Sequence, residues 1–218
     1  MIMDNRSKWI WSAFDAKEDD QYVYLRKVIR RDKPLGRVTV RVTACNQYKL
    51  YMNGEWVGTG PSPSNPAYTY YDTYTLDIDS PVAVIAAVCY FIGCATYMVT
   101  EQNQGVGAFR LELEGGDIFE ATDDSWAVCS QTGHFRDYIH LGSSRISNWG
   151  GYKETFLAER EPHGWMGDEY AGDAFHPAVV VKDAETVFTR LLPREIPPCC
   201  VRRCIPRLCC RQRRIWAV

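Results

Sequence analysis

Residues 38–78 constrain the fold more than any other part of this chain. Apolar residues alternate with polar ones over residues 38–44, which predicts an extended strand with one apolar face. Further on, the chain breaks at residues 60–66, whose three prolines cannot donate hydrogen bonds to a sheet, and it resumes in an aromatic run at residues 68–74. We expect function to lie at this loop and its aromatic exit.

Between these features the dipeptide Asn53-Gly54 predicts a β-hairpin. It separates two strand-like runs, and both of its residues favour the positive φ angles of a type I′ turn. With a two-residue loop, we expect Tyr51 opposite Trp56 on one face of the hairpin. On the other face, we expect Leu50 opposite Val57.

The rest of the chain has the pattern of an all-β protein. Strand-like runs occur at residues 9–11, 22–29, 82–91, 109–113, 118–119, 126–128 and 179–181. Turn residues separate them at intervals of roughly ten residues, and no stretch keeps a helical period. We therefore expect an antiparallel β-sandwich. A chain of 218 residues buries enough surface to form this core without disulfides or a metal.

The last part of the chain differs in composition, so we expect one sandwich domain at residues 1–193 and a tail at residues 194–218. The tail has seven arginines against one glutamate and holds five of the nine cysteines. These cysteines lack the paired Cys-x-x-Cys spacing of a zinc site. We expect this tail to be disordered or out of frame. The acidic remainder argues against nucleic-acid binding.

The location of the protein is expected to be cytoplasmic. No apolar segment typical of a secretory signal precedes Trp9, and the longest nearly apolar run, residues 81–94, is too short to cross a membrane. Cys45, Cys89, Cys94 and Cys129 lie in strand-like segments without a disulfide framework, which is typical of reduced core thiols. We expect no membrane partner.

Several of these motifs together resemble a known family. The motifs are residues 48–58, Gly60-Pro61, residues 70–74, 109–113, 122–128, 150–154, 178–181 and 193–197. In this order they resemble the N-terminal β-sandwich region of bacterial α-L-rhamnosidases and related glycoside hydrolases, over roughly residues 9 to 198. The resemblance implies a jelly-roll-like, galactose-binding-like sandwich.

The resemblance also implies that the chain lacks a catalytic machine. In that family, hydrolysis is carried out by a separate helical α/α barrel that follows the sandwich domains, and nothing after Pro198 has the length to form one. A glycosidase of the usual kind needs two carboxylates facing each other across a sugar. The sequence offers many carboxylates and no means to select a pair. We therefore name no catalytic residue, and whether the chain alone is an enzyme stays open.

Sugar recognition needs an aromatic plate beside carboxylate or amide groups. Two clusters offer this combination, and they supply the candidate carbohydrate-binding residues Tyr70, Tyr71, Asp72, Trp149, Tyr152 and Glu154. The alternative is that the aromatics fill the core and the carboxylates cap turns. The four histidines show no metal or nucleophile motif, and Gly105-Val-Gly107 lacks the third glycine of a dinucleotide site. We expect no cofactor and no metal.

Three functions remain open from the sequence. The first is a non-catalytic N-terminal fragment of an α-L-rhamnosidase-like hydrolase that supports or extends carbohydrate binding. Its partners would be a rhamnose-containing glycan or glycoside and the catalytic barrel domain of the parent enzyme. The second is an autonomous carbohydrate-binding module. The third is a small hydrolase that uses carboxylates within the sandwich.

Overall fold

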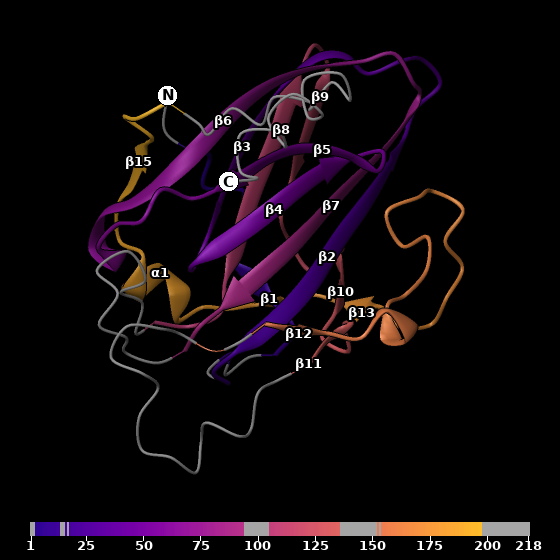
Figure 1. Cartoon of the computed structure of the whole chain (residues 1–218). Helices are drawn as coiled ribbons and strands as arrows, with labels where there is room; N and C mark the ends of the chain where they lie inside the picture. Colours follow the sequence, from indigo (N-terminus) through magenta and orange to yellow (C-terminus); the bar gives the residue numbers. More distant parts are fainter. Residues whose placement is uncertain are drawn as a thin grey trace, which may run out of the picture.

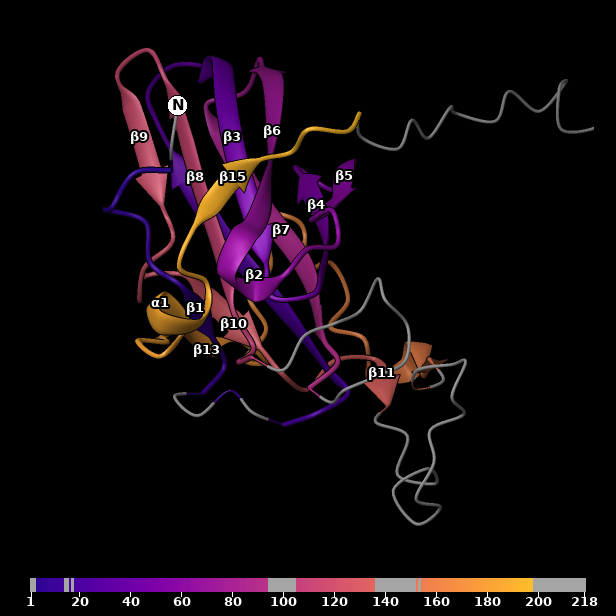
Figure 2. The same ribbon diagram turned by 90° about the vertical axis from the view of Figure 1, so that its left-hand side faces the viewer.

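The computed structural model of the chain describes residues 3–13, 16, 18–93, 105–135, 152 and 154–197. Two β-sheets face each other, with strands of the second sheet nearest the viewer in Figure 1 and the two layers separated in Figure 2. Neighbouring strands run antiparallel except at one edge of the first sheet. The predicted all-β antiparallel sandwich is confirmed.

The first sheet, called sheet A, has the strand order β14-β1-β8-β3-β6-β15, with β9 paired to β8. Its strands are β1 (Ile10–Trp11), β3 (Gly36–Ala44), β6 (Thr69–Ile78), β8 (Phe109–Gly115), β9 (Ile118–Ala121), β14 (Val179–Val180) and β15 (Leu191–Pro193). The predicted alternation of β3 is confirmed, because Val38, Val40 and Val42 face the core and are buried.

The second sheet, called sheet B, has the strand order β13-β10-β2-β7-β4-β5. Its strands are β2 (Gln21–Arg30), β4 (Gln47–Met52), β5 (Glu55–Gly60), β7 (Val82–Phe91), β10 (Ala127–Cys129) and β13 (His176–Pro177). The bounds of β7 coincide with the continuous apolar run in the sequence. A short ribbon of β11 (His134–Phe135) and β12 (Thr155–Phe156) is a third, two-stranded sheet.

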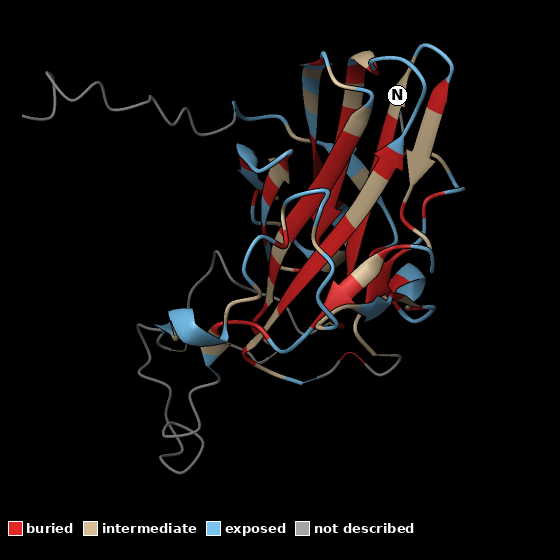
Figure 3. Cartoon of the chain, turned by 90° about the vertical axis from the view of Figure 1, so that its right-hand side faces the viewer, coloured by how far each residue is buried: buried red, intermediate tan, exposed pale blue. Residues whose placement is uncertain are grey.

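Apolar side chains from both sheets fill the space between them. Figure 3 shows that buried residues follow the strands, while exposed residues gather in the connections. Trp9, Trp11 and Trp126 are fully buried in this core. The core therefore rests on apolar burial, the dominant stabilising term in folding.

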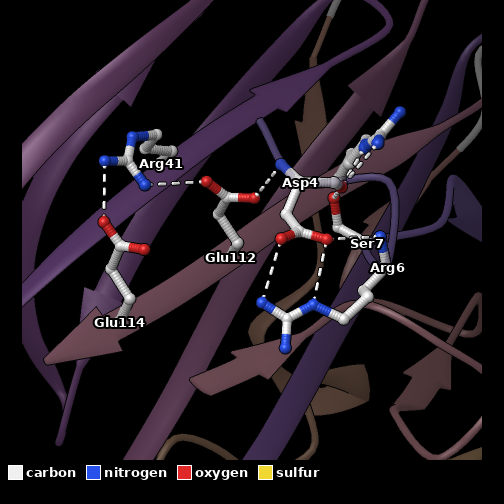
Figure 4. Close-up of polar contacts among 7 residues, drawn as sticks. Asp4, Arg6, Ser7, Arg41, Glu112 and Glu114 are labelled. Atoms are coloured by element: carbon white, nitrogen blue, oxygen red, sulfur yellow. Dashed lines mark hydrogen bonds and ion pairs between the residues drawn. The ribbon is translucent and has the colours of Figure 1, made fainter. Parts of the chain in front are cut away.

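The outer face of sheet A is polar, and the N-terminal segment covers part of it. Arg41 in β3 forms ion pairs of 2.8 Å with Glu112 and Glu114 of β8, and the backbone N–H of Asp4 donates to the same Glu112 carboxylate at 2.6 Å (Figure 4). Arg110 donates to the Ser7 hydroxyl at 2.8 Å. The N-terminal segment is thus fastened across this face of the sheet by charged groups.

The predicted hairpin forms, but its register is only half correct. Tyr51 lies opposite Trp56 as expected, whereas Leu50 lies opposite Gly58 and not opposite Val57. A β-bulge between Leu50 and Tyr51 shifts the register, because one extra residue is inserted in β5. Asn53 and Gly54 adopt the positive φ angles expected of the turn.

Four short elements were not predicted from the sequence. They are α1 (Ala184–Val187), the 3-10 turns η1 (Pro66–Tyr68) and η4 (Ala158–Arg160), and the parallel strand β15. Arg194, placed in the tail by the sequence analysis, donates its backbone N–H to Tyr71 at 3.0 Å and belongs to the folded body. The remainder of the predicted tail from residue 198 onward lies outside the described residues. Within the part that the structure describes, no helix is long and apolar enough to span a membrane.

Candidate carbohydrate-binding surface

The first predicted cluster lies in β6, and most of it is inside the protein. Tyr71 and Asp72 each expose only 2% of their surface, while Tyr70 is half-buried. Asp72 pairs across the sheet with Val42, so its side chain lies on the core side. Tyr71 lies on the opposite side, where the covered face of sheet A encloses it. A ligand cannot reach these two side chains, contrary to their selection as sugar contacts.

Asp72 instead joins the two sheets through a buried polar network. Tyr48 of β4 donates its hydroxyl to the Asp72 carboxylate, and the hydroxyls of Tyr48 and Tyr74 are 3.1 Å apart. The Nη1 atom of Arg194 lies 2.9 Å from the other carboxylate oxygen. Burial raises the pKa of Asp72, although Tyr48 and Arg194 act in the opposite direction. This cluster is a structural tie between layers.

The second predicted cluster lies at one end of sheet B, on its outer side. Tyr152 donates its hydroxyl to the Asp19 carboxylate, just before β2. The Glu154 carboxylate lies 3.1 Å from Nε2 of His134, and its side chain is 54% exposed. Trp149, the third member of this predicted cluster, lies outside the described residues. The structure therefore brings Tyr152 and Glu154 to the same end of the sandwich as solvent-reachable groups.

His134 is the centre of an aromatic stack at this end. Its ring lies parallel to Tyr22 at 3.9 Å between centroids, and Tyr22 stacks in turn on Tyr90 at 4.4 Å. Phe156 of β12 meets the His134 ring edge-on at 5.1 Å. Phe156 is 48% exposed, and it contacts the same imidazole that the Glu154 carboxylate meets. We call Phe156, His134, Tyr22 and Glu154 the ribbon surface.

A buried layer supports the ribbon surface from behind. Glu161 accepts hydrogen bonds from the Tyr24 hydroxyl at 2.6 Å and from the Trp165 indole at 3.0 Å, and the Tyr24 and Trp165 rings stack at 4.6 Å. The Tyr24 hydroxyl also lies 3.2 Å from Nδ1 of His134. These contacts fix the position of the imidazole, which is a condition for a pre-organised binding surface.

Burial has two electrostatic consequences here. It lowers the pKa of His134 below the usual histidine value, against the opposing effect of Glu154. It also raises the pKa of Tyr24, and the nearby Glu161 carboxylate adds to this rise. Burial therefore favours the neutral form of the imidazole.

The sequence analysis missed Phe156 and His134. Phe156 and Ala158 lie among charged residues, a pattern that marks no ligand site, and His134 has no metal or nucleophile motif. Their roles depend on the pairing of His134 with Phe156 in the ribbon, between segments about twenty residues apart. No group of three or more His, Cys, Asp or Glu side chains that could hold a metal occurs among the residues that the structure describes.

The sandwich fold of this chain also occurs in solved structures of α-L-rhamnosidases. Neither a protein-family model nor a curated protein matches the sequence. Among solved structures, the chain is similar to the GH78 family rhamnosidase of Bacillus sp. GL1, with 25% identity over 90% of this chain and a TM-score of 0.72. The chain covers 20% of that protein.

Two further α-L-rhamnosidases share the fold. The enzyme from Dictyoglumus thermophilum is 16% identical over 88% of this chain, with a TM-score of 0.65 and 22% of its own length covered. The enzyme from Aspergillus terreus is 16% identical over 89% of this chain, with a TM-score of 0.65 and 23% of its own length covered. The resemblance to α-L-rhamnosidases is confirmed, and this chain spans about a fifth of their length.

Proposed function

We propose that this chain is a non-catalytic accessory module of an α-L-rhamnosidase-like glycoside hydrolase and that it supports or extends carbohydrate binding. The observation that carries the proposal is the match of nearly the whole chain to one fifth of the Bacillus sp. GL1 rhamnosidase. The partners are then a rhamnose-containing glycan or glycoside and the catalytic domain of the parent enzyme. We also propose a cytoplasmic location, which the free buried thiols of Cys45, Cys89 and Cys129 support.

The ribbon surface supports sugar recognition. A pyranose ring has an apolar C–H face that packs on an aromatic ring, and its hydroxyl edge donates to carboxylates. Phe156 offers the ring, and Glu154 offers the carboxylate beside it. His134, held by Tyr22 and Tyr24, keeps the two groups in place.

The non-catalytic part of the proposal is tested with p-nitrophenyl α-L-rhamnoside. The purified 218-residue chain is expected to release no p-nitrophenol above the buffer blank. The chain is then fused to the catalytic domain of a related rhamnosidase from which the matching sandwich has been removed. The fusion is expected to regain turnover that the truncated enzyme has lost. Turnover by the chain alone would instead support the small-hydrolase hypothesis.

The binding part is tested by titration calorimetry with L-rhamnose and with a rhamnose-containing oligosaccharide. Phe156→Ala and Glu154→Gln are each expected to raise Kd by roughly tenfold, the effect of losing one stacking or charge-assisted contact. Tyr68→Ala is the matched control, because Tyr68 is 49% exposed and lies at η1. Equal losses in all three variants would contradict a specific role for the ribbon surface.

An autonomous carbohydrate-binding module is the second candidate function, and the exposure of Phe156 beside Glu154 favours it. The two candidates differ in what the isolated chain does. A free module binds its sugar with the same Kd alone and in the fusion. An accessory module that completes a cleft binds more tightly in the fusion, because the second domain then contributes contacts.

A further inference from the structure

A pocket lies on the outer side of sheet B, at the end opposite to the ribbon surface. Its volume is about 330 Å³, at the lower end of the range for small-molecule sites. Val84 lines it, six residues along β7 from Tyr90, which corresponds to about 20 Å along a strand. The pocket is therefore separate from the ribbon surface.

The floor of the pocket is apolar and its rim is polar. Val82, Val84 and Met166 provide the apolar lining. Asn53 from the β4–β5 turn, Ser80 before β7, and Asp168 provide an amide, a hydroxyl and a carboxylate. Three separate segments of the chain thus converge on one small space.

The walls are held by contacts that exist without a ligand. Arg26 donates to the backbone oxygen of Gly167 at 2.7 Å, which fixes the segment that carries Met166 and Asp168. The Asn53 amide oxygen accepts from the backbone N–H of Val84 at 2.7 Å, which fixes the turn against β7. The pocket is therefore pre-formed, and binding there costs little ordering of the chain.

The polar groups keep hydrogen-bonding capacity toward the pocket. Ser80 accepts from the backbone N–H of Val82 at 3.0 Å, so its own O–H remains a donor. Asp168 is 43% exposed and meets Arg30 at 3.5 Å through one oxygen, Oδ2, in an exposed ion pair that contributes little stability. A carboxylate at the rim repels anions, and three polar groups around so small a space disfavour a purely apolar ligand.

We propose that this pocket is a second carbohydrate subsite that holds one neutral sugar ring. The C–H face of the ring packs on the aliphatic side chains of Val82 and Met166, which take the place of the aromatic plate at the ribbon surface, and its hydroxyls bind Asp168 and Ser80. The inference rests on the proposed function, since it extends sugar binding to a second place on the same sheet. Together the two sites would hold separate rings of one extended glycan or two separate glycans.

The test is ¹⁵N NMR titration of the full chain with L-rhamnose, D-glucose and a rhamnose-containing oligosaccharide. Saturable shifts are expected at the amides of Val84, Gly167 and Asp168. Asp168→Asn removes the acceptor charge, and Val84→Phe fills the pocket from its floor. Each is expected to raise Kd at these amides by roughly tenfold or more. Asp124→Asn, at an exposed turn, is the control for loss of one carboxylate.

The outcomes separate the two proposals. Shifts that disappear in the pocket variants and persist in Phe156→Ala support the second subsite. Shifts confined to the ribbon surface, unchanged by Asp168→Asn, would overturn the subsite and leave the proposed function intact. No saturable shift with any of the three sugars would overturn both. Two controls confirm that each variant is folded: its far-UV circular dichroism spectrum and the chemical shift of the Tyr24 amide should both match those of the wild type.

Discussion

Arg194 reaches back into the sandwich and forms an ion pair with Asp72, with 2.9 Å between Nη1 and Oδ1. Asp72 lies on the core side of β6, and Arg194 follows β15 more than a hundred residues later. The pair therefore joins an early strand to the last strand of the sheet. Tyr48 shares the same carboxylate from the opposite sheet, so one charged group holds three parts of the chain.

Loss of either partner is expected to destabilise the fold strongly. Asp72→Ala leaves Arg194 without its charge partner, and Arg194→Ala leaves a buried carboxylate, so each should cost about 3 kcal/mol of unfolding free energy. Urea denaturation at pH 7 measures this. Arg190→Ala, at an exposed position over the Tyr68 ring at 5.4 Å, should cost less than about 1 kcal/mol. A loss at Asp72 as small as that of the control would show the pair to be dispensable.

Gly60 is expected to be intolerant of a side chain. A Cβ atom there would overlap the Asp72 carboxylate and approach the Tyr48 hydroxyl to 2.8 Å. Gly60→Ala should therefore cost about 2 kcal/mol, as overpacking does. At Gly116, which has φ +56° and no atom within 4 Å of a Cβ, Gly116→Asn should cost less than about 1 kcal/mol. The comparison uses thermal unfolding, and equal shifts in Tm would contradict the steric argument.

The two glutamates that contact Arg41 are expected to differ in their effect on stability. The Glu112 side chain is 1% exposed and that of Glu114 is 39% exposed, although both lie 2.8 Å from Arg41 (Figure 4). Glu112→Ala breaks a buried pair and should cost about 3 kcal/mol, whereas Glu114→Ala should cost less than about 1 kcal/mol. The midpoints of urea denaturation of the two variants, compared with that of the wild type, measure this difference. A larger loss of stability in Glu114→Ala than in Glu112→Ala would contradict the prediction that the buried pair stabilises the fold more.

Stability is expected to fall in acid because of His134. Its pKa is lowered in the folded state by burial, so below pH 6.5 the unfolded chain takes up a proton that the folded chain resists. The free energy of unfolding that depends on the neutral His134 is fully present above pH 6.5. It is lost as the pH falls through the pKa of His134 in the folded state. The groups that face the His134 ring are three aromatic side chains and three charged ones: Tyr22, Tyr24, Phe156, Glu154, Glu161 and Lys49.

Urea unfolding of the wild type and of His134→Gln at pH 8, 7, 6 and 5 measures this effect. The variant should show a flatter decline between pH 7 and pH 5. The control is His163→Gln, at an exposed position, which should follow the wild-type curve. Parallel curves for wild type and His134→Gln would place the acid sensitivity elsewhere.

The local pattern of apolar and polar residues was sufficient to predict most strands of the fold. Alternation located β3, and the apolar run located β7 to the residue. The bulge in β5 was not predictable, because an extra residue leaves no trace in the turn dipeptide. Strand β15 has three residues and a parallel partner far along the chain, so no period marks it.

The candidate site was harder to predict from the sequence than the fold. Alternation places Asp72 on the apolar side of β6, where a carboxylate is stable only because Arg194 and Tyr48 meet it. That encounter is tertiary, so the sequence could not separate a buried tie from a sugar contact. Glu154 and Tyr152 were selected for their chemistry, and the structure adds the exposed Phe156 that gives the surface its aromatic face.

The parallel pairing of β15 with Thr69–Tyr71 of β6 has a consequence for biosynthesis. On the ribosome, β6 emerges long before its last neighbour, and one flank of sheet A stays open during that interval. Asp72 meanwhile lacks its cation, which disfavours early burial of the carboxylate. The domain therefore completes its folding only after residue 194 has left the exit tunnel, and a nascent chain halted earlier keeps an open strand edge that invites association.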